Sequence, residues 1–301
     1  MEMKEIKAID TMNRVYYCKT ELLQPAFDFY EFKLMTKTTL AGLIRRMELS
    51  QGEEWKLYYG LGAKRSVKEM VAEMDEMGVE YVFMDQMKLW SWRDSAMMMD
   101  ISIETIAGII EESNGRVIGG AGYNPHRIEE SLKEIERAVK EYGFKYVWFH
   151  PVTFGLALND KKCYPLYAKC LELGIPVCLQ SGQAAEPLPS EGGRPYYADE
   201  VAIDFPGLTI VLTHTGWPWV DEWISMLWRH PNVYGNIGAY FPKDLDPAQV
   251  LFMDGRGRDK VLWATNGFGL ERCKKEFLEL PIRDEQKSKI LRENAVKVFR
   301  L

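Results

Sequence analysis

Two of the four histidines in this chain directly follow short apolar runs that are rich in β-branched and aromatic residues. His150 comes after residues 145–149, and His214 comes after residues 208–213. Because an imidazole titrates near neutral pH, either side chain could accept or donate a proton in catalysis. His126 and His230 stand beside prolines, at a helix start and in a turn, so we expect both on the surface.

Other side chains stand at or just past the ends of similar apolar runs. If those runs are parallel strands of one barrel, their carboxyl ends converge on a single face, where barrel enzymes build their sites. Competing chemistries have little support, because the sequence contains no GxSxG elbow, P-loop or HExxH motif. The further candidates at run ends are Asp10, Met12, Arg14, Asp85, Tyr123, Asn124, Gln180, Ser181, Asn236 and Asn266.

Eight apolar runs of strand length must position these residues. Eight parallel strands close a barrel, and most gaps between the later runs hold an amphipathic helix pattern. A doubly wound open sheet would also fit continuous apolar runs, but no GxGxxG turn follows the first one. We therefore predict an α/β fold, a (β/α)8 TIM barrel forming one domain over residues 1–301. Its strands are expected at residues 6–10, 79–84, 117–122, 145–149, 175–180, 208–213, 233–237 and 260–264.

Two helices show the expected pattern of caps. Asn124 and Pro125 are expected to cap and start a helix that ends at Gly143. In the same way, Ser66 should begin a helix that Gly78 ends just before the second strand. Both helices should pack outside the barrel.

Two segments are longer than a βα repeat requires. Residues 11–65 follow the first strand and residues 181–207 follow the fifth. Both segments therefore begin at the face of the barrel where active sites are built, and we expect them to form a lid or a partner surface.

The composition excludes several classes of protein. A hydrophobic fraction of 47% with 27% charged residues is typical of a globular protein. The net charge of -6, with no basic stretch rich in aromatics, argues against a nucleic-acid partner. No apolar run approaches the ~20 residues that span a membrane, and the start lacks signal-peptide features, so no membrane association and a cytoplasmic location are expected. The five cysteines should be reduced, buried thiols.

Several segments, in order along the chain, resemble the amidohydrolase superfamily, specifically its amidohydrolase-related, ACMSD-like decarboxylase/hydrolase family. The resemblance covers essentially the whole chain and implies a TIM barrel that acts on a small carboxylated compound, as a homodimer. The segments that carry it are residues 9–10, 143–151, 164–177, 204–216, 261–266 and 293–299.

The resemblance also identifies where a divalent metal would be held: two residues after strand one, a histidine after strand five and an aspartate after strand eight. In this sequence those positions read Met12, Arg14, Gln180 and Asn266. A thioether, a guanidinium and two neutral amides are not the deprotonated or imidazole ligands that Zn²⁺ or Mn²⁺ needs. We expect no metal or other cofactor, although a Zn²⁺ or Mn²⁺ ion on Asp10, His150 and His214 stays an alternative.

These replacements leave two functions open. In the first, Arg14 binds a substrate carboxylate or stabilises a developing oxyanion while His214 moves the proton. In the second, the barrel is inactive and serves as a binding or partner protein. The replacements are mostly polar, so we favour an enzyme that decarboxylates, hydrolyses or hydrates a small carboxylated cyclic or aromatic compound. The expected catalytic residues are Asp10, Arg14 and His214, and the expected substrate-binding residues are His150, Gln180, Asn266 and Trp217.

Overall fold

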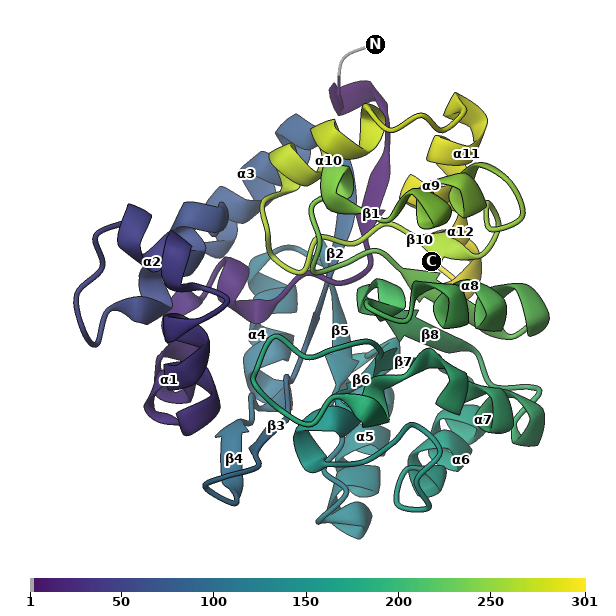
Figure 1. Cartoon of the computed structure of the whole chain (residues 1–301), viewed down its shortest axis with the longest axis horizontal. Helices are drawn as coiled ribbons and strands as arrows, with labels where there is room; N and C mark the ends of the chain where they lie inside the picture. The colour runs from purple at the N-terminus through teal and green to yellow at the C-terminus, as the bar shows by residue number, and fades with distance from the viewer. Residues whose placement is uncertain (1–2) are drawn as a thin grey trace.

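A computed structural model of the chain describes residues 3–301. At its centre, eight parallel strands form one sheet that curls into a TIM barrel, with the strands in chain order (Figure 1). This confirms the predicted fold class and all eight predicted strands. They are β1 (Ala8–Asp10), β2 (Val79–Asp85), β5 (Val117–Ala121), β6 (Tyr146–Phe149), β7 (Val177–Gln180), β8 (Ile210–Thr213), β9 (Val233–Asn236) and β10 (Val261–Leu262).

Backbone hydrogen bonds join the first and last strands just beyond their carboxyl ends. The amide of Thr11 donates to the carbonyl of Trp263 at 3.1 Å, and the amide of Asn266 donates to the carbonyl of Met12 at 2.7 Å. The loop after β1 is thereby fixed against the loop after β10. These two loops carry Arg14 and Asn266, which the sequence places 252 positions apart.

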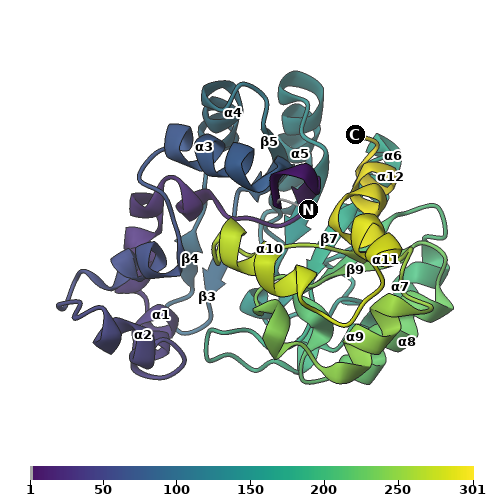
Figure 2. The ribbon, with the colours of Figure 1, turned by 90° about the horizontal axis from the view of Figure 1, so that it is seen from above.

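Helices lie outside the strands in both ribbon views (Figures 1 and 2). The predicted caps of α3 are confirmed, since the Ser66 hydroxyl accepts from the amide of Glu69 at 3.2 Å and Gly78 has a φ of 65°. The barrel helices are α3 (Val67–Met77), α4 (Ile103–Glu112), α5 (Ile128–Tyr142), α6 (Tyr164–Leu173), α7 (Ala198–Asp204), α8 (Val220–Arg229), α9 (Pro247–Asp254), α10 (Leu270–Leu278), α11 (Asp284–Ser288) and α12 (Asn294–Phe299).

The predicted start of α5 was wrong by about one turn, although Gly143 ends it as expected. Asn124 does not cap the helix, whose N-cap is Arg127. The side-chain oxygen of Asn124 instead accepts from the amide of His126 at 2.9 Å, which is the local hydrogen bond of an Asx turn. This turn holds the chain out of the helix for three residues.

The long segment between β1 and α3 folds into α1 (Tyr30–Lys37), α2 (Ala41–Arg46) and 3-10 helices, and it projects to one side of the barrel (Figure 1). An unpredicted hairpin of β3 (Leu89–Ser91) and β4 (Ala96–Met99) follows β2 and supports this segment. The buried carboxylate of Glu31 accepts from the Ser91 hydroxyl at 2.9 Å and from the amide of Arg93 at 3.0 Å. The hairpin was missed because the residues that join its strands, 92–95, include no glycine and no Asn-Gly or Asp-Gly pair to mark a turn.

Two further expectations are decided by burial. His126 is exposed as predicted, but His230 is buried, because its Nε2 lies 2.7 Å from a carboxylate oxygen of Asp199. All five cysteines are buried and free, as expected. Within residues 3–301, no helix has both the length and the apolar character needed to cross a bilayer.

Candidate active site

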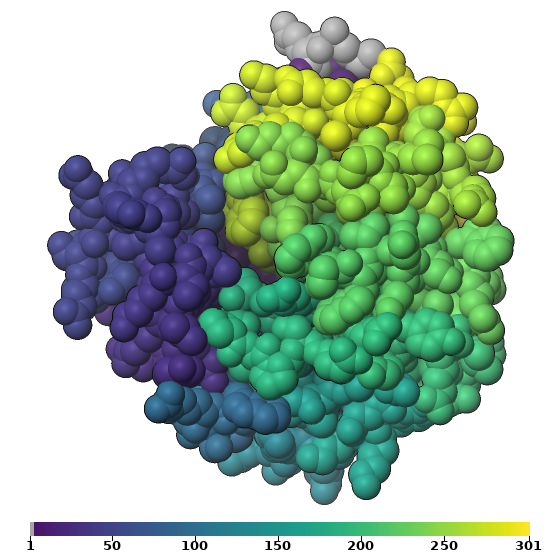
Figure 3. Space-filling view, viewed as in Figure 1, coloured from purple at the N-terminus to yellow at the C-terminus, as the bar shows by residue number. Residues whose placement is uncertain are grey.

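A cavity of about 490 Å³ lies at the carboxyl ends of the strands, between the barrel and the segment 11–65. Figure 3 shows the molecule hollowed where this purple segment meets the green half of the barrel. Six of the seven predicted site residues line the cavity, which brings together positions from five strand ends. They are Arg14, His150, Gln180, His214, Trp217 and Asn266.

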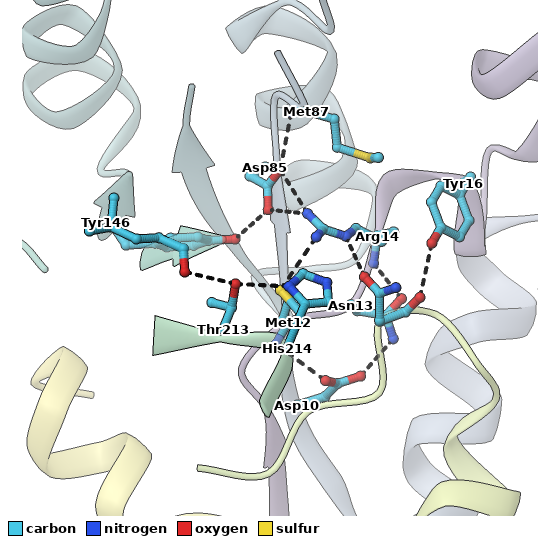
Figure 4. A network of polar contacts seen from close by, with 12 residues as sticks. Asp10, Met12, Asn13, Arg14, Tyr16, Asp85, Met87, Tyr146, Thr213 and His214 are labelled. Carbon is cyan, nitrogen blue, oxygen red and sulfur yellow. Dashed lines mark hydrogen bonds and ion pairs between the residues drawn. The ribbon is translucent and has the colours of Figure 1, made fainter. Parts of the chain in front are cut away.

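Arg14 is at the centre of the polar network of this cavity (Figure 4). Its Nε donates to the side-chain oxygen of Asn266 at 2.7 Å, and its Nη1 lies 3.2 Å from a carboxylate oxygen of Asp85. The guanidinium also stacks on Trp148, with its central carbon 4.0 Å from the ring centroid. Only Nη2 lacks an oxygen partner, since it faces the sulfur of Met12 at 3.4 Å. These contacts hold the guanidinium in one orientation and leave Nη2 available to a ligand.

Asp85 neutralises this cation and was not given a role from the sequence, although it ends the second strand. Its side chain is 1% exposed and also accepts from the amide of Met87 at 3.1 Å. Burial raises the pKa of its carboxyl, and the Arg14 charge opposes that rise. No sequence signal distinguishes Asp85 from other aspartates at strand ends, because the pairing depends on how the Arg14 side chain turns.

Asp10 is the one predicted site residue that does not line the cavity. Its carboxylate accepts from the Thr265 hydroxyl at 2.6 Å, from the amide of Thr265 at 2.9 Å and from the Asn13 side chain at 2.8 Å. These bonds join the loop that carries Arg14 to the loop that carries Asn266. Asp10 thus supports the geometry from below the site, and the structure does not place it where it could touch a substrate.

His214 lies on a turn that constrains its ring. His214, Thr215 and Gly216 have consecutive φ values of 66°, 61° and 70°, a left-handed conformation that is costly for the first two residues. The amide of His214 donates to the side-chain oxygen of Asn236 at 3.3 Å, which helps to hold the turn. Burial lowers the pKa of His214 well below its usual value, and the charge of Arg14 lowers it further.

The hydrogen bonds around Thr213 assign the tautomer of His214. The Thr213 hydroxyl has one proton, which it donates to the carbonyl of Leu179 at 3.1 Å. The same oxygen lies 2.9 Å from Nδ1 of His214, and with its proton on Leu179 it accepts from that nitrogen. This arrangement assigns the proton of the neutral ring to Nδ1 and makes Nε2 the acceptor, and the side chain of Asn266 is a further hydrogen-bonding neighbour of the ring.

His150 lies beside this pair and is also neutral. Burial, and then the charge of Arg14, lower the pKa of His150 to about 3. Its side chain is 4% exposed, and its Nδ1 has no hydrogen-bond partner. It packs edge-on against Trp148, with ring centroids 5.6 Å apart. Two neutral imidazoles and one paired cation thus share the floor of the cavity.

The upper wall is mostly apolar and comes largely from the segment 11–65. Trp217 is 47% exposed at the opening, and Glu186 from the loop 181–207 is the one acidic side chain in the lining. Burial raises the pKa of the Glu186 carboxyl. None of these apolar residues was predicted from the sequence; they include Leu23, Phe32, Met35, Leu40, Leu43 and Leu61.

The donor set does not fit a divalent metal. The guanidinium of Arg14 contacts both Met12 and Asn266, so a cation of the protein already stands between the positions where ligands would be expected. Across residues 3–301, no three or more histidine, cysteine, aspartate or glutamate side chains are grouped so that they could hold a metal ion. The alternative site on Asp10, His150 and His214 is not assembled either, because the carboxylate of Asp10 is directed to Thr265 and Asn13.

Comparisons with known proteins agree with this architecture. The family model described as Amidohydrolase matches residues 53–301. The 2-keto-4-carboxy-3-hexenedioate hydratase of Sphingobium sp. is 25% identical over 206 residues, which cover 56% of this chain and 60% of that protein. The match therefore spans less than two thirds of the hydratase.

Two solved structures share the fold. An uncharacterized TIM-barrel protein from Bordetella bronchiseptica superimposes with a TM-score of 0.74 at 23% identity, over 98% of each chain. The 5-carboxyvanillate decarboxylase of Novosphingobium aromaticivorans, complexed with manganese and 4-hydroxy-3-methoxy-5-nitrobenzoic acid, has a TM-score of 0.60 at 16% identity, over 99% of this chain and 97% of that one.

Proposed function

The chain belongs to the amidohydrolase family, and on that premise we propose that it adds water to, or hydrolyses, a small carboxylated planar compound without a metal. One observation carries this proposal: a neutral histidine and a fixed, paired cation line the same cavity. His214 is the base, and Arg14 binds the anionic group. We therefore favour an enzyme over an inactive barrel.

Arg14 suits a carboxylate because one of its nitrogens remains free of strong partners. Nη2 contacts only a thioether, which is a weak acceptor. A substrate oxygen bound there would receive a charge-assisted hydrogen bond in a site that largely excludes water. The apolar wall and the stacked Trp148 favour a flat or cyclic body next to the carboxylate.

Water addition to a double bond conjugated with a carbonyl uses these groups in a balanced sequence. Nε2 of His214 takes a proton from water as its oxygen bonds to the far carbon of the double bond. The displaced electron pair moves onto the carbonyl oxygen, whose negative charge Arg14 stabilises. The proton then returns from His214 to the near carbon, so that one water is added and the base is regenerated.

Decarboxylation is favoured less by the same geometry. After carbon dioxide leaves, the carbanion carbon needs a proton donor, whereas His214 rests in its neutral form with Nδ1–H directed to Thr213. The lowered pKa of His214 keeps the ring neutral, so the resting enzyme holds no imidazolium proton for the carbanion, although the same shift makes the ring a weaker base. The matched relative that is named a hydratase supports water addition as well.

Turnover of unsaturated and aromatic carboxylates by the purified protein tests this proposal. We expect incorporation of labelled oxygen from water into the product, and its loss in His214→Asn, in Arg14→Met and in Arg14→Met/Asp85→Leu, of which the last leaves no buried charge unpaired. His126→Asn is the control, because His126 is exposed and lies outside the cavity lining. Unchanged rates in any site variant, or release of carbon dioxide without label uptake, contradict the proposed chemistry. Tight binding without any product supports the binding protein instead.

A further inference from the structure

The mouth of the cavity has a second cation, which the proposed reaction does not use. Arg46, the last residue of α2, lines the cavity together with Arg14 and is exposed. Leu43, which also lines the cavity, is three positions earlier and hence on the same face of the helix. Arg45 is exposed too but does not line the cavity. One face of α2 therefore presents a guanidinium to the opening.

The charge of Arg46 is not used in an ion pair with the protein. In the part of the chain that the structure describes, nine of the sixteen arginines pair with a carboxylate, which leaves those nine little reason to bind an anion. Within residues 3–301, the arginines in such pairs are Arg14, Arg116, Arg137, Arg194, Arg229, Arg258, Arg272, Arg283 and Arg292. Arg46 is not among them, so its donors remain available to a ligand.

The lining between the two arginines is mainly apolar, and the charge of Arg14 is balanced by Asp85 and not by this wall. Leu23, Phe32 and Leu43 belong to this wall. Glu186 is the one acid that lines it, and burial favours the neutral form of that carboxyl by raising its pKa. A cavity with a cation at its floor, an apolar middle and a cation at its mouth is complementary to an elongated molecule with an anion at each end.

We propose that Arg46 forms a second anion-binding subsite, so that the substrate carries two carboxylates separated by an apolar or planar body. This inference rests on the proposed function, because Arg14 is taken to bind the first carboxylate. Arg46 is exposed, so its contribution to affinity is modest, on the order of three- to fivefold, and salt screens it strongly. Arg14 is buried and is screened much less.

Two matched pairs of probes test the subsite at two lengths: benzoate with terephthalate, and biphenyl-4-carboxylate with biphenyl-4,4′-dicarboxylate. Their affinities are measured by calorimetry and by the fluorescence of Trp148 and Trp217, which line the cavity. We expect at least one dicarboxylate to bind the wild-type protein about three- to fivefold more tightly than its monocarboxylate. Arg46→Gln should abolish this gain without weakening the monocarboxylate, and Arg45→Gln, the control with the same loss of charge, should keep it.

The possible results distinguish failure of the second subsite from failure of the proposed function. If monocarboxylates bind and are lost in Arg14→Met, but neither dicarboxylate gains affinity, the second subsite is wrong and the proposed function stands. Equal effects of Arg46→Gln and Arg45→Gln also overturn the subsite. They would indicate that the second carboxylate is attracted by the positive charge of this surface as a whole and not by a specific contact with Arg46. If no probe binds, or Arg14→Met leaves binding unchanged, both proposals fail.

Discussion

The guanidinium Nη1 of Arg14 and the carboxylate Oδ2 of Asp85 lie 3.2 Å apart, and the two side chains are 3% and 1% exposed. Such a pair has little access to water, so each charge depends on the other for its stabilisation. The pair also leaves the floor of the cavity close to neutral before a substrate arrives. A substrate carboxylate therefore brings the net charge of the site to about minus one, and the amide of Asn266 and the unpartnered indole N–H of Trp148 are the groups that could donate to it.

Removal of one partner should destabilise the protein strongly. Asp85→Ala leaves the Arg14 cation buried without a counter-charge, which we expect to lower the free energy of unfolding by about 3–5 kcal/mol. Urea denaturation followed by circular dichroism measures this loss. Stability equal to that of the wild type would mean that Arg14 leaves the cavity floor when Asp85 is absent.

The double variant Arg14→Met/Asp85→Leu separates stability from function. Two apolar side chains of similar size remove both buried charges together, so most of the lost stability should return. This double variant should not bind benzoate, because it lacks the cation of Arg14. A double variant that is as unstable as Asp85→Ala would show that packing, rather than charge, dominates at this position.

The tautomer of His214 leads to a second prediction. Thr213→Val removes the acceptor of Nδ1–H while keeping the shape of the side chain, so the ring is no longer held with Nε2 free. The lost hydrogen bond is worth about 1–1.5 kcal/mol, so we expect a fall in kcat on the order of tenfold with little change in KM. Nitrogen NMR of labelled histidine should show the tautomer of His214 becoming mixed.

Thr213→Ser is the matched control, because it keeps the hydroxyl and loses only a methyl group. We expect this variant to retain the wild-type tautomer and most of kcat. A serine variant as slow as the valine variant would assign the effect to packing of the strand end.

Independence from metals is the third prediction. The guanidinium of Arg14 contacts Met12 and Asn266, two of the side chains that would have to act as ligands. Dialysis against a chelator should therefore leave the melting temperature, benzoate binding and turnover unchanged, and elemental analysis should find far less than one zinc or manganese per chain. Stoichiometric metal, or activity that is lost to the chelator and restored by manganese, would contradict this prediction.

The sequence was sufficient to predict the strands and the convergence of the site, for a physical reason. Parallel strands covered on both faces are continuous apolar runs, and their carboxyl ends must meet at one face of the barrel. Residues as distant as Arg14 and Asn266 could therefore be placed in one cavity from pattern alone. The family resemblance added which of these positions would otherwise hold a metal.

The remainder depended on side-chain directions, which pattern does not specify. Asp10 and Asp85 are each the last residue of a strand. The carboxylate of Asp10 is nevertheless directed to Thr265, whereas the carboxylate of Asp85 is directed to Arg14. His230 was expected on the surface because it precedes a proline, but it is buried and hydrogen-bonds Asp199 of α7. In each case the deciding contact joins residues at least 31 positions apart.

The buried histidines lead to the fourth prediction, on how stability depends on pH. The pKa of His150 is lowered to about 3 in the folded protein, against an ordinary value near 6.5 in the unfolded chain. Between these two values the unfolded chain binds more protons than the folded protein, so the free energy of unfolding falls as the pH falls below about 6.5. His214 acts in the same direction.

His150→Phe should remove one part of this acid sensitivity. The substitution loses no hydrogen bond of Nδ1, since that atom has no partner. From pH 7 to pH 5, the wild type should lose about 2 kcal/mol more stability than the variant, which is the free energy of protonating one histidine in the unfolded chain alone. Urea denaturation at the two pH values measures this difference, and the two proteins should run parallel from pH 7 to pH 9, where neither form of His150 is charged. Parallel behaviour below pH 6 as well would mean that His150 takes up its proton in the folded state, which requires water or an anion to reach it.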